Sequence, residues 1–157
     1  MIDIETTKLD GVKKIINNDS FEDFRGEYVE TYNKKLYFDN GVLIDFVQDD
    51  ISVSHKHVLR GFHGDDRTTK LVTVLNGRGY AIIADNRRDS PTYKQWQSFT
   101  LSKQTKHQLL LPPGVGNSIL ALEDNVVYYL ALRSPRGWQR VICPGYAKSL
   151  RHKECKN

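Results

Sequence analysis

The sequence predicts an all-β protein built from antiparallel strands. Short segments rich in β-branched and aromatic residues recur along the chain, and turn residues separate them at close spacing. Almost no stretch shows the apolar period of an amphipathic helix. These observations favour a sandwich or barrel of eight or more strands. A chain of 157 residues suits one domain with one core.

The first part of the chain predicts few strands. Residues 1–20 are polar with scattered Ile, Val and Leu, and could hold one short edge strand. Residues 21–26 are expected to form a turn that closes at Gly26, and residues 34–40 a loop or a helical turn. Around these, the β-branched and aromatic content predicts strands over 27–33 and 42–48.

The remaining chain predicts seven strands and two hairpins. Asn76-Gly77 and Glu123-Asp124-Asn125 each stand between two apolar runs, which is the usual signal for a hairpin. Pro112-Pro113-Gly114 is a hard turn. The expected strands are Val58–Phe62, Lys70–Leu75, Gly79–Asp85, Tyr93–Leu101, Gln108–Leu111, Ser118–Leu122 and Val126–Leu132.

Composition excludes several classes of protein. A hydrophobic content of 39% and a charged content of 27% indicate a globular chain. No apolar run could span a bilayer and the N-terminus does not resemble a signal peptide, so we expect no membrane partner and a cytoplasmic location. The net charge of +4 is mild and no nucleic-acid-binding module is visible, so no nucleic-acid partner is expected. Cys143 and Cys155 lack zinc-ligand spacing and are interpreted as reduced thiols.

His63 is the candidate general base. It stands in the run Arg60-Gly61-Phe62-His63-Gly64, and histidine can take and return a proton near neutral pH. A structural histidine bonded to a backbone carbonyl is the commoner alternative for a lone histidine. In a regular strand Arg60 and His63 point to opposite faces. They could share a cavity only if the strand bends near Gly61, which a glycine permits.

Basic and phenolic side chains could complete such a site. Arg25, Arg60 and Lys70 could hold a diphosphate, and Lys70 could instead stabilise an enolate. Surface ion pairs are the alternative for each of them. Tyr128 or Tyr129, if it faces a cavity, could protonate a carbanion, while aromatic packing is the alternative.

The pair His55-Lys56-His57 raises the possibility of a metal site. Both rings would lie on one face of a strand, and His63 and His107 could complete the ligand set. No carboxylate stands at a suitable offset, and the pair precedes the strand in a polar segment. A solvated loop is therefore the favoured interpretation, and no metal is expected.

A set of short motifs follows the same order as in a known family. The sequence resembles the dTDP-4-dehydrorhamnose 3,5-epimerase (RmlC-type) family. Within it, the chain is similar to epimerases of GDP-linked 4-keto-6-deoxy-heptoses from bacterial capsule pathways, through the runs 60–65 and Gly116-Asn117. The motifs that carry the family resemblance are Phe24-Arg25-Gly26, Glu30–Asn33, Phe46–Asp49, Val58–His63, Lys70–Val72, Asp85-Asn86-Arg87, Ser90–Tyr93 and Pro113-Gly114.

The resemblance implies a fold and an activity. It implies one cupin jelly-roll domain over residues 1–157, without a cofactor or catalytic metal, usually in a homodimer that exchanges strands. The implied activity is epimerisation of a nucleotide-diphospho-sugar, in which His63 abstracts the proton next to the C4 ketone and Lys70 and Arg60 lie by the ketone and diphosphate. The residues implied to line the substrate are Arg25, Tyr28, Glu30, Gln48 and, where many members have histidine, Asn117; some would come from the partner subunit.

The sequence departs from the family pattern at three places. The family's tyrosine acid aligns on Leu130, and Tyr128 stands two residues earlier on the same strand face. Ala81 replaces a polar residue, and no motif after Trp138 matches the family's C-terminal segment with its aspartate. Epimerisation at C3 alone or at C3 and C5 both remain open. The alternatives are a catalytically inactive relative that binds nucleotide sugar and a sugar 3,4-ketoisomerase.

Overall fold

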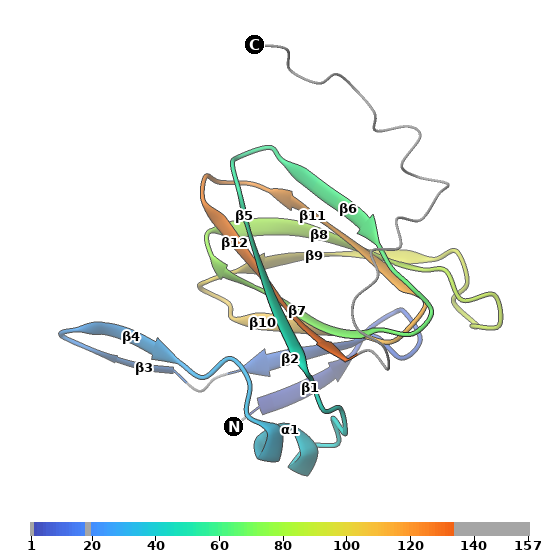
Figure 1. Cartoon of the computed structure of the whole chain (residues 1–157), viewed down its shortest axis with the longest axis horizontal. Coiled ribbons are helices and arrows are strands. Elements are labelled where there is room, and N and C mark those ends of the chain that lie inside the picture. The colour runs from blue at the N-terminus through green and yellow to red at the C-terminus, as the bar shows by residue number, and fades with distance from the viewer. Residues whose placement is uncertain (1, 18–19, 134–157) are drawn as a thin grey trace.

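Antiparallel β-structure dominates the computed structural model, which describes residues 2–17 and 20–133, and this confirms the predicted all-β class (Figure 1). A six-stranded sheet in the order β1-β2-β10-β7-β12-β5 faces a four-stranded sheet in the order β6-β11-β8-β9. The strands are β1 Ile2–Thr6, β2 Lys13–Asn17, β3 Ser20–Asp23, β4 Gly26–Val29, β5 Gln48–Ser54, β6 Leu59–His63, β7 Thr69–Asn76, β8 Arg78–Asp85, β9 Trp96–Ser102, β10 His107–Leu111, β11 Val115–Ala121 and β12 Val126–Arg133.

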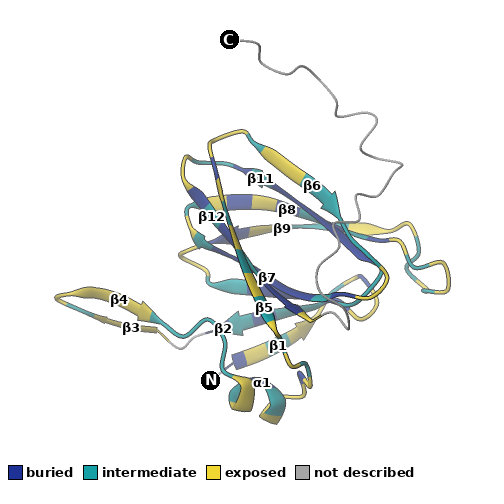
Figure 2. Ribbon diagram, in the orientation of Figure 1, coloured by how far each residue is buried: buried dark blue, intermediate teal, exposed yellow. Residues whose placement is uncertain are grey.

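The core lies between the two sheets. Central strands β7, β10 and β11 are largely buried, and in β8 every second residue is buried (Figure 2). Val72, Leu109 and Ile83 are among its fully buried side chains. Each such side chain contributes about 1.5–3 kcal/mol relative to exposure, so this cluster holds the sheets face to face.

A second cluster covers the outer face of the six-stranded sheet. It contains the helix α1 (Lys34–Asp39), which begins after Asn33 because the Asn33 side chain accepts a hydrogen bond of 3.1 Å from the backbone N–H of Leu36. Tyr37 of α1 and Val42 are fully buried against this face. The alternative of a helical turn over 34–40 is thereby confirmed.

The predicted strand over 42–48 is wrong. Residues 42–47 are not in a strand, and β5 begins at Gln48. The backbone carbonyl of Ile44 accepts a hydrogen bond from the Tyr32 hydroxyl at 3.1 Å, and Val42 bonds to Tyr37 of α1, so the segment packs as a loop over the sheet. Its apolar residues pack in the second cluster and do not form a strand.

Several predicted boundaries need correction near the N-terminus. Residues 2–17 form two paired strands, β1 and β2, where one edge strand was expected. The expected turn over 21–26 is narrower, because β3 and β4 pair from Ser20–Val29 to Asp23–Gly26. β4 ends at Val29, so the strand expected over 27–33 is shorter.

Both hairpin predictions are wrong, because the strands on either side of each turn do not pair with each other. β7 and β8 flank Gly77, and β11 and β12 flank residues 122–125, yet each pair is split between the two sheets. The two turns are corners that pass from sheet to sheet, and they lie together because Asn76 donates a side-chain hydrogen bond to the carbonyl of Asn125 at 2.9 Å. The turn residues reverse the chain direction, but the strands before and after each turn form their hydrogen bonds with other strands.

The motif Asp85-Asn86-Arg87 with Ser90–Tyr93 forms a polar anchor around the buried carboxylate of Asp85. Arg87 donates two hydrogen bonds to the carboxylate of Asp85, at 2.9 and 2.8 Å, and Thr92 donates a third at 2.6 Å. Arg87 also bonds to the backbone carbonyl of Asp10, which ties the β1–β2 turn to this loop. Burial alone would raise the pKa of Asp85, but the hydrogen bonds from Arg87, Ser90 and Thr92 outweigh it and hold that pKa well below its usual range.

Replacing Asp85 with asparagine should destabilise the fold by about 3 kcal/mol at neutral pH, because Arg87 loses its buried partner. The pKa of the Asp85 carboxyl is lowered in the folded state. Its contribution to the free energy of unfolding is therefore complete above about pH 4, the ordinary pKa of an aspartate, and is lost progressively below that pH. Urea unfolding at several pH values should therefore show the difference between wild type and Asp85→Asn shrinking as the pH falls. Asp89→Asn, an exposed change in the same turn, is the control; an undiminished difference at acid pH would contradict the prediction.

In the described part of the chain, no helix has the length and apolarity needed to cross a membrane.

Candidate functional site

A cavity of about 480 Å³ lies between the two sheets, beside their edge strands β5 and β6. Strands from both sheets line it, and most of the lining residues have polar side chains. The lining residues are Gln48, Asp49, Asp50, Ile51, Ser52, Arg60, His63, Lys70, Asn117, Ile119, Tyr128 and Leu130. The set includes six of the nine residues singled out from the sequence.

Arg60 and His63 both line the cavity because β6 is irregular between them. Asn117 of β11 pairs with His63 and Ile119 pairs with Arg60, so between these pairs two residues of β6 oppose one of β11. At Gly61 φ is +133°, and an added Cβ would lie 2.6 Å from the Cα of Ser118. Only glycine fits there, and the predicted bend is thereby confirmed.

Lys70 is buried at the wall of the cavity. It has 4% exposure, and its ammonium donates hydrogen bonds to the backbone carbonyl of His63 at 2.9 Å and to Oδ1 of Asn117 at 3.0 Å. The β7 ammonium is thus fixed beside the β6 histidine. Because a cation in a low-dielectric pocket stabilises developing negative charge strongly, this wall can stabilise an oxyanion.

Asn117 links Lys70 to Tyr128. Its amide donates to the Tyr128 hydroxyl at 3.2 Å while its oxygen accepts from Lys70. Tyr128 is 3% exposed, and burial raises the pKa of its phenol, against a smaller opposite effect of the Asn117 hydrogen bond. Tyr129 points to the other face of β12 and donates to Asp49 at 2.7 Å. Of the two tyrosines, therefore, Tyr128 is the one at the cavity.

The β5 wall carries a polar stripe. Gln48, Asp50 and Ser52 alternate with exposed residues along the strand and line the cavity. Arg60 bridges from β6 to the end of this strand, donating to Oγ of Ser54 at 2.7 Å and to the carbonyl of Val53 at 3.0 Å. Sequence inspection missed Asp50 and Ser52, although the alternation of polar residues over 48–52 was a usable signal.

Three predicted substrate-binding residues lie outside the cavity. Arg25 and Tyr28 belong to the β3–β4 hairpin, which projects away from the two main sheets (Figure 1). Arg25 pairs with Asp23 of the same hairpin, and Tyr28 is 73% exposed. Glu30 follows the hairpin and accepts a hydrogen bond from Asn33. A role for these residues remains a prediction.

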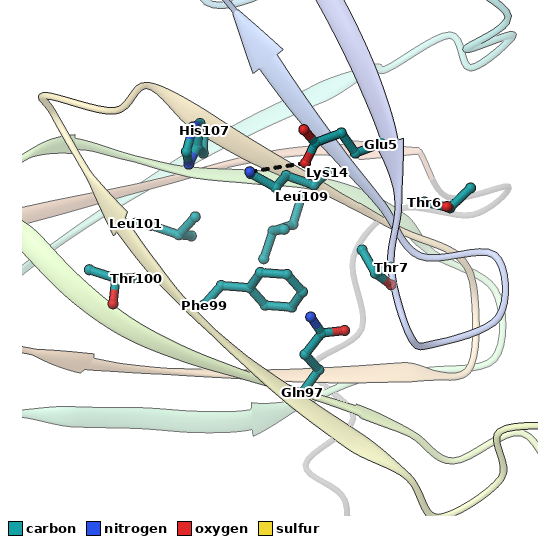
Figure 3. Close-up of a pocket in the computed structure, with 10 residues that line it drawn as sticks. All are labelled: Glu5, Thr6, Thr7, Lys14, Gln97, Phe99, Thr100, Leu101, His107 and Leu109. Carbon is teal, nitrogen blue, oxygen red and sulfur yellow. Dashed lines mark hydrogen bonds and ion pairs between the residues drawn. The ribbon is translucent and has the colours of Figure 1, made fainter.

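A different cavity of about 320 Å³ is lined by residues of β1, β2 and β10 in the six-stranded sheet and of β9 in the four-stranded sheet. Figure 3 shows Phe99 and Leu109 in its lining, beside Gln97 and the Glu5–Lys14 ion pair of 3.1 Å. Its histidine is His107, whose pKa is lowered by burial and by Lys14. The lysine of this cavity is already paired with a carboxylate, and the cavity shares no residue with the one at His63. It is therefore not the candidate site.

Within residues 2–17 and 20–133, no three His, Cys, Asp or Glu side chains gather as a metal site. His55 and His57 lie in the loop between β5 and β6, and His107 lies at the other cavity.

Comparison with known proteins identifies the family. The family model for dTDP-4-dehydrorhamnose 3,5-epimerase matches residues 6–139. The enzyme of that name from Methanothermobacter thermautotrophicus is 36% identical over 123 residues, which is 77% of this chain and 66% of that protein. The one from Salmonella typhimurium is 37% identical over 66% of this chain and 59% of its own length. The chain thus spans about two-thirds or less of these two relatives.

Solved structures agree in fold. The dTDP-4-dehydrorhamnose 3,5-epimerase of Bacillus anthracis, with TDP and pyrophosphate bound, superposes with a TM-score of 0.80 at 33% identity, covering 87% of this chain and 80% of that one. The Legionella pneumophila RmlC, in complex with dTDP-4-keto-L-rhamnose, gives 0.78 at 29% identity, covering 94% and 91%. The cupin jelly-roll prediction is confirmed, and the chain belongs to the dTDP-4-dehydrorhamnose 3,5-epimerase family.

Proposed function

We propose that the protein epimerises a nucleotide-linked 4-keto-6-deoxy sugar, at C3 or at C3 and C5, by removing a proton next to the C4 ketone. The observation that carries the proposal is the placement of the Lys70 ammonium against the His63 carbonyl, at the wall of one cavity. A base and an oxyanion-stabilising cation side by side are what enolisation of a ketone requires. Family membership supports the substrate class.

The proposed chemistry divides the two roles between these residues. The His63 imidazole takes the proton from the carbon next to the ketone, and the electron pair of the C–H bond moves to the ketone oxygen. The Lys70 ammonium stabilises the resulting enolate. Asn117 holds Lys70 in place from the other side, and reprotonation from the opposite face gives the epimer.

Arg60 and Gln48 are assigned to substrate binding. Arg60 lies at the Ser54 end of β5, and Gln48 at the other end of the same strand. A guanidinium can form paired hydrogen bonds with phosphate oxygens, so Arg60 is proposed to receive the diphosphate. The sugar would then extend towards His63 and Lys70.

Solvent exchange tests the proposal. A dTDP-linked 4-keto-6-deoxyhexose is incubated with the protein in D₂O, and NMR follows the C3 and C5 protons of substrate and product. Deuterium uptake with inversion at C3 alone assigns a C3 epimerase, and uptake with inversion at both carbons a 3,5-epimerase. Tight binding without uptake would overturn the proposal in favour of a nucleotide-sugar-binding protein, and a 3-keto product in favour of a ketoisomerase.

We further propose a specific nucleotide and sugar for this substrate. The resemblance at Arg60–Asp65 and Gly116-Asn117 points to a GDP-linked 4-keto-6-deoxyheptose, used in making a surface polysaccharide in the cytoplasm. The same exchange assay run with GDP- and dTDP-linked substrates compares kcat/KM directly. A strong preference for the dTDP-linked hexose would overturn the heptose assignment.

The proposal includes a homodimer. Phe24 and Tyr28 on the β3–β4 hairpin are 97% and 73% exposed, an unusual placement for aromatic residues in a monomer. The predicted substrate residues Arg25 and Tyr28 stand on the same hairpin, so a second copy is proposed to receive it beside its own cavity. Sedimentation equilibrium at micromolar concentration should give twice the chain mass of 18.1 kDa. A monomer at these concentrations would contradict this.

A further inference from the structure

We propose that Asp50 is a second catalytic residue, which exchanges a proton with the sugar on the face opposite His63. The inference rests on the proposed epimerase activity and adds a residue that sequence inspection did not single out. It starts from the position of the Asp50 side chain on the β5 wall of the cavity.

Strand register places Asp50 on the inner face of the six-stranded sheet. Asp50 pairs directly with Leu130 of β12, and Ser52 pairs with Tyr128. Directly paired residues project to the same face of a sheet. Because Leu130 and Tyr128 also line the cavity, the Asp50 carboxylate stands on the cavity side, next to an apolar neighbour.

The Asp50 carboxylate is oriented by a neutral donor. The Gln48 amide donates to both of its oxygens, at 3.2 and 3.0 Å. In the described part of the chain, no lysine or arginine forms an ion pair with it, whereas Asp85 and Glu27 do have such partners. A carboxylate accepts about four hydrogen bonds, so Asp50 keeps capacity for a ligand.

The opposite wall carries His63. His63 lies on β6 of the four-stranded sheet and Asp50 on β5 of the six-stranded sheet, and the cavity lies between. A sugar ring held there would present one face to each residue. Inversion at a carbon requires a proton to leave one face and another to arrive at the opposite face, which a single base on one wall cannot do.

Other polar groups of the cavity fit this second role less well. The Lys70 ammonium is bonded to the His63 carbonyl and so belongs to the His63 side. The Tyr128 hydroxyl accepts a hydrogen bond from Asn117 and is buried, 3% exposed. Hydroxyl and amide groups such as those of Ser52 and Gln48 have no pKa near neutrality and are poor general acids and bases. The other cavity carboxylate, Asp49, accepts a hydrogen bond from Tyr129, which points to the other face of β12. Asp50 is therefore the carboxyl group whose inward placement suits the task.

The proposed step balances in protons and electrons. His63, neutral, takes the proton from C3, and the C–H electron pair forms the enolate beside Lys70. Asp50, which takes up a proton from solvent before this step, gives that proton to the other face of C3; the enolate electrons form the new C–H bond and restore the ketone. The products are a His63 imidazolium and an Asp50 carboxylate, which exchange protons with solvent to reset. In the reverse direction the same two groups exchange roles.

The test separates exchange from inversion. In D₂O, with a dTDP-linked 4-keto-6-deoxyhexose, Asp50→Asn should invert C3 about 10²–10⁴-fold more slowly than wild type. His63 remains, so deuterium should still enter C3 of the starting sugar with its configuration retained. Asp50→Glu, which keeps a carboxyl group, should recover part of the inversion.

Asp3→Asn is the matched control, because it removes an exposed carboxylate from β1, the other edge strand of the same sheet. It should leave inversion unchanged, and thermal melts should show that all variants fold. Inversion by Asp50→Asn at the wild-type kcat would overturn this inference and leave the epimerase proposal standing. A rise in KM alone would also overturn it, since that would indicate a binding role. Absence of any uptake by wild type would instead overturn the epimerase proposal.

Discussion

His63→Asn should reduce deuterium uptake at C3 of a 4-keto-6-deoxy sugar nucleotide by about 10³-fold or more. Asparagine has nearly the same reach as histidine but cannot accept a proton near neutral pH. Enolisation would then rely on water. Uptake at every exchanging carbon next to the ketone should fall if His63 is the only base, so the measurement follows C3 and C5 separately by NMR.

The control for His63 is the histidine of the other cavity. His107→Asn removes a half-buried imidazole from β10, at the cavity of Figure 3, and should leave exchange unchanged. Binding of the nucleotide sugar, measured by calorimetry, should change little in His63→Asn because the diphosphate is assigned to Arg60. Wild-type exchange in His63→Asn, with or without changed binding, would remove His63 from the proposed mechanism.

Strands with buried, apolar sequences were predictable. β7 and β12 were expected within one residue at each end, because β-branched and aromatic residues dominate them and both strands are buried in the sheet. The pairing of strands was not predictable in the same way. Asn76-Gly77 indicates a chain reversal, but whether the next strand pairs with β7 or crosses to the other sheet depends on contacts distant in sequence.

The bounds of β5 were not predicted because its apolar side chains face outwards and its polar side chains face the cavity. Ile51 and Val53 are 62% and 57% exposed, while Asp50 and Ser52 face the cavity. A strand that lines a polar cavity need not place its apolar side inward, so a search for apolar runs moved the strand to 42–48. The same arrangement concealed Asp50, whose proposed role is inferred from its register with Leu130.

Within the candidate site, sequence inspection succeeded where a local feature constrained the geometry. Gly61 made a bend plausible, and the bend brings Arg60 and His63 to one cavity. Sequence inspection could not show that Lys70, seven residues later, donates a hydrogen bond to the carbonyl of His63, because that contact joins strands of different sheets. Residues that a second subunit would contribute lie beyond what one chain can position.

Lys70→Met should lower kcat for epimerisation by about 10²–10³-fold, with a smaller change in KM. Methionine matches the length of the lysine stem but carries no charge, so the enolate would form beside an apolar group. The ground-state ketone is neutral and gains less from the ammonium than the enolate does. Loss of the interaction should therefore fall mainly on kcat, which is the signature of stabilisation in the transition state.

Stability must be measured with this variant, since Lys70 is 4% exposed and its loss leaves the His63 carbonyl and Asn117 Oδ1 without that donor. The cost should be about 1–3 kcal/mol, visible in urea unfolding, and the folded fraction should remain high at assay temperature. Lys8→Met, an exposed change between β1 and β2, is the control for loss of one positive charge. If Lys70→Met raised KM while kcat stayed constant, Lys70 would bind the diphosphate instead, and the oxyanion would need another donor in the cavity.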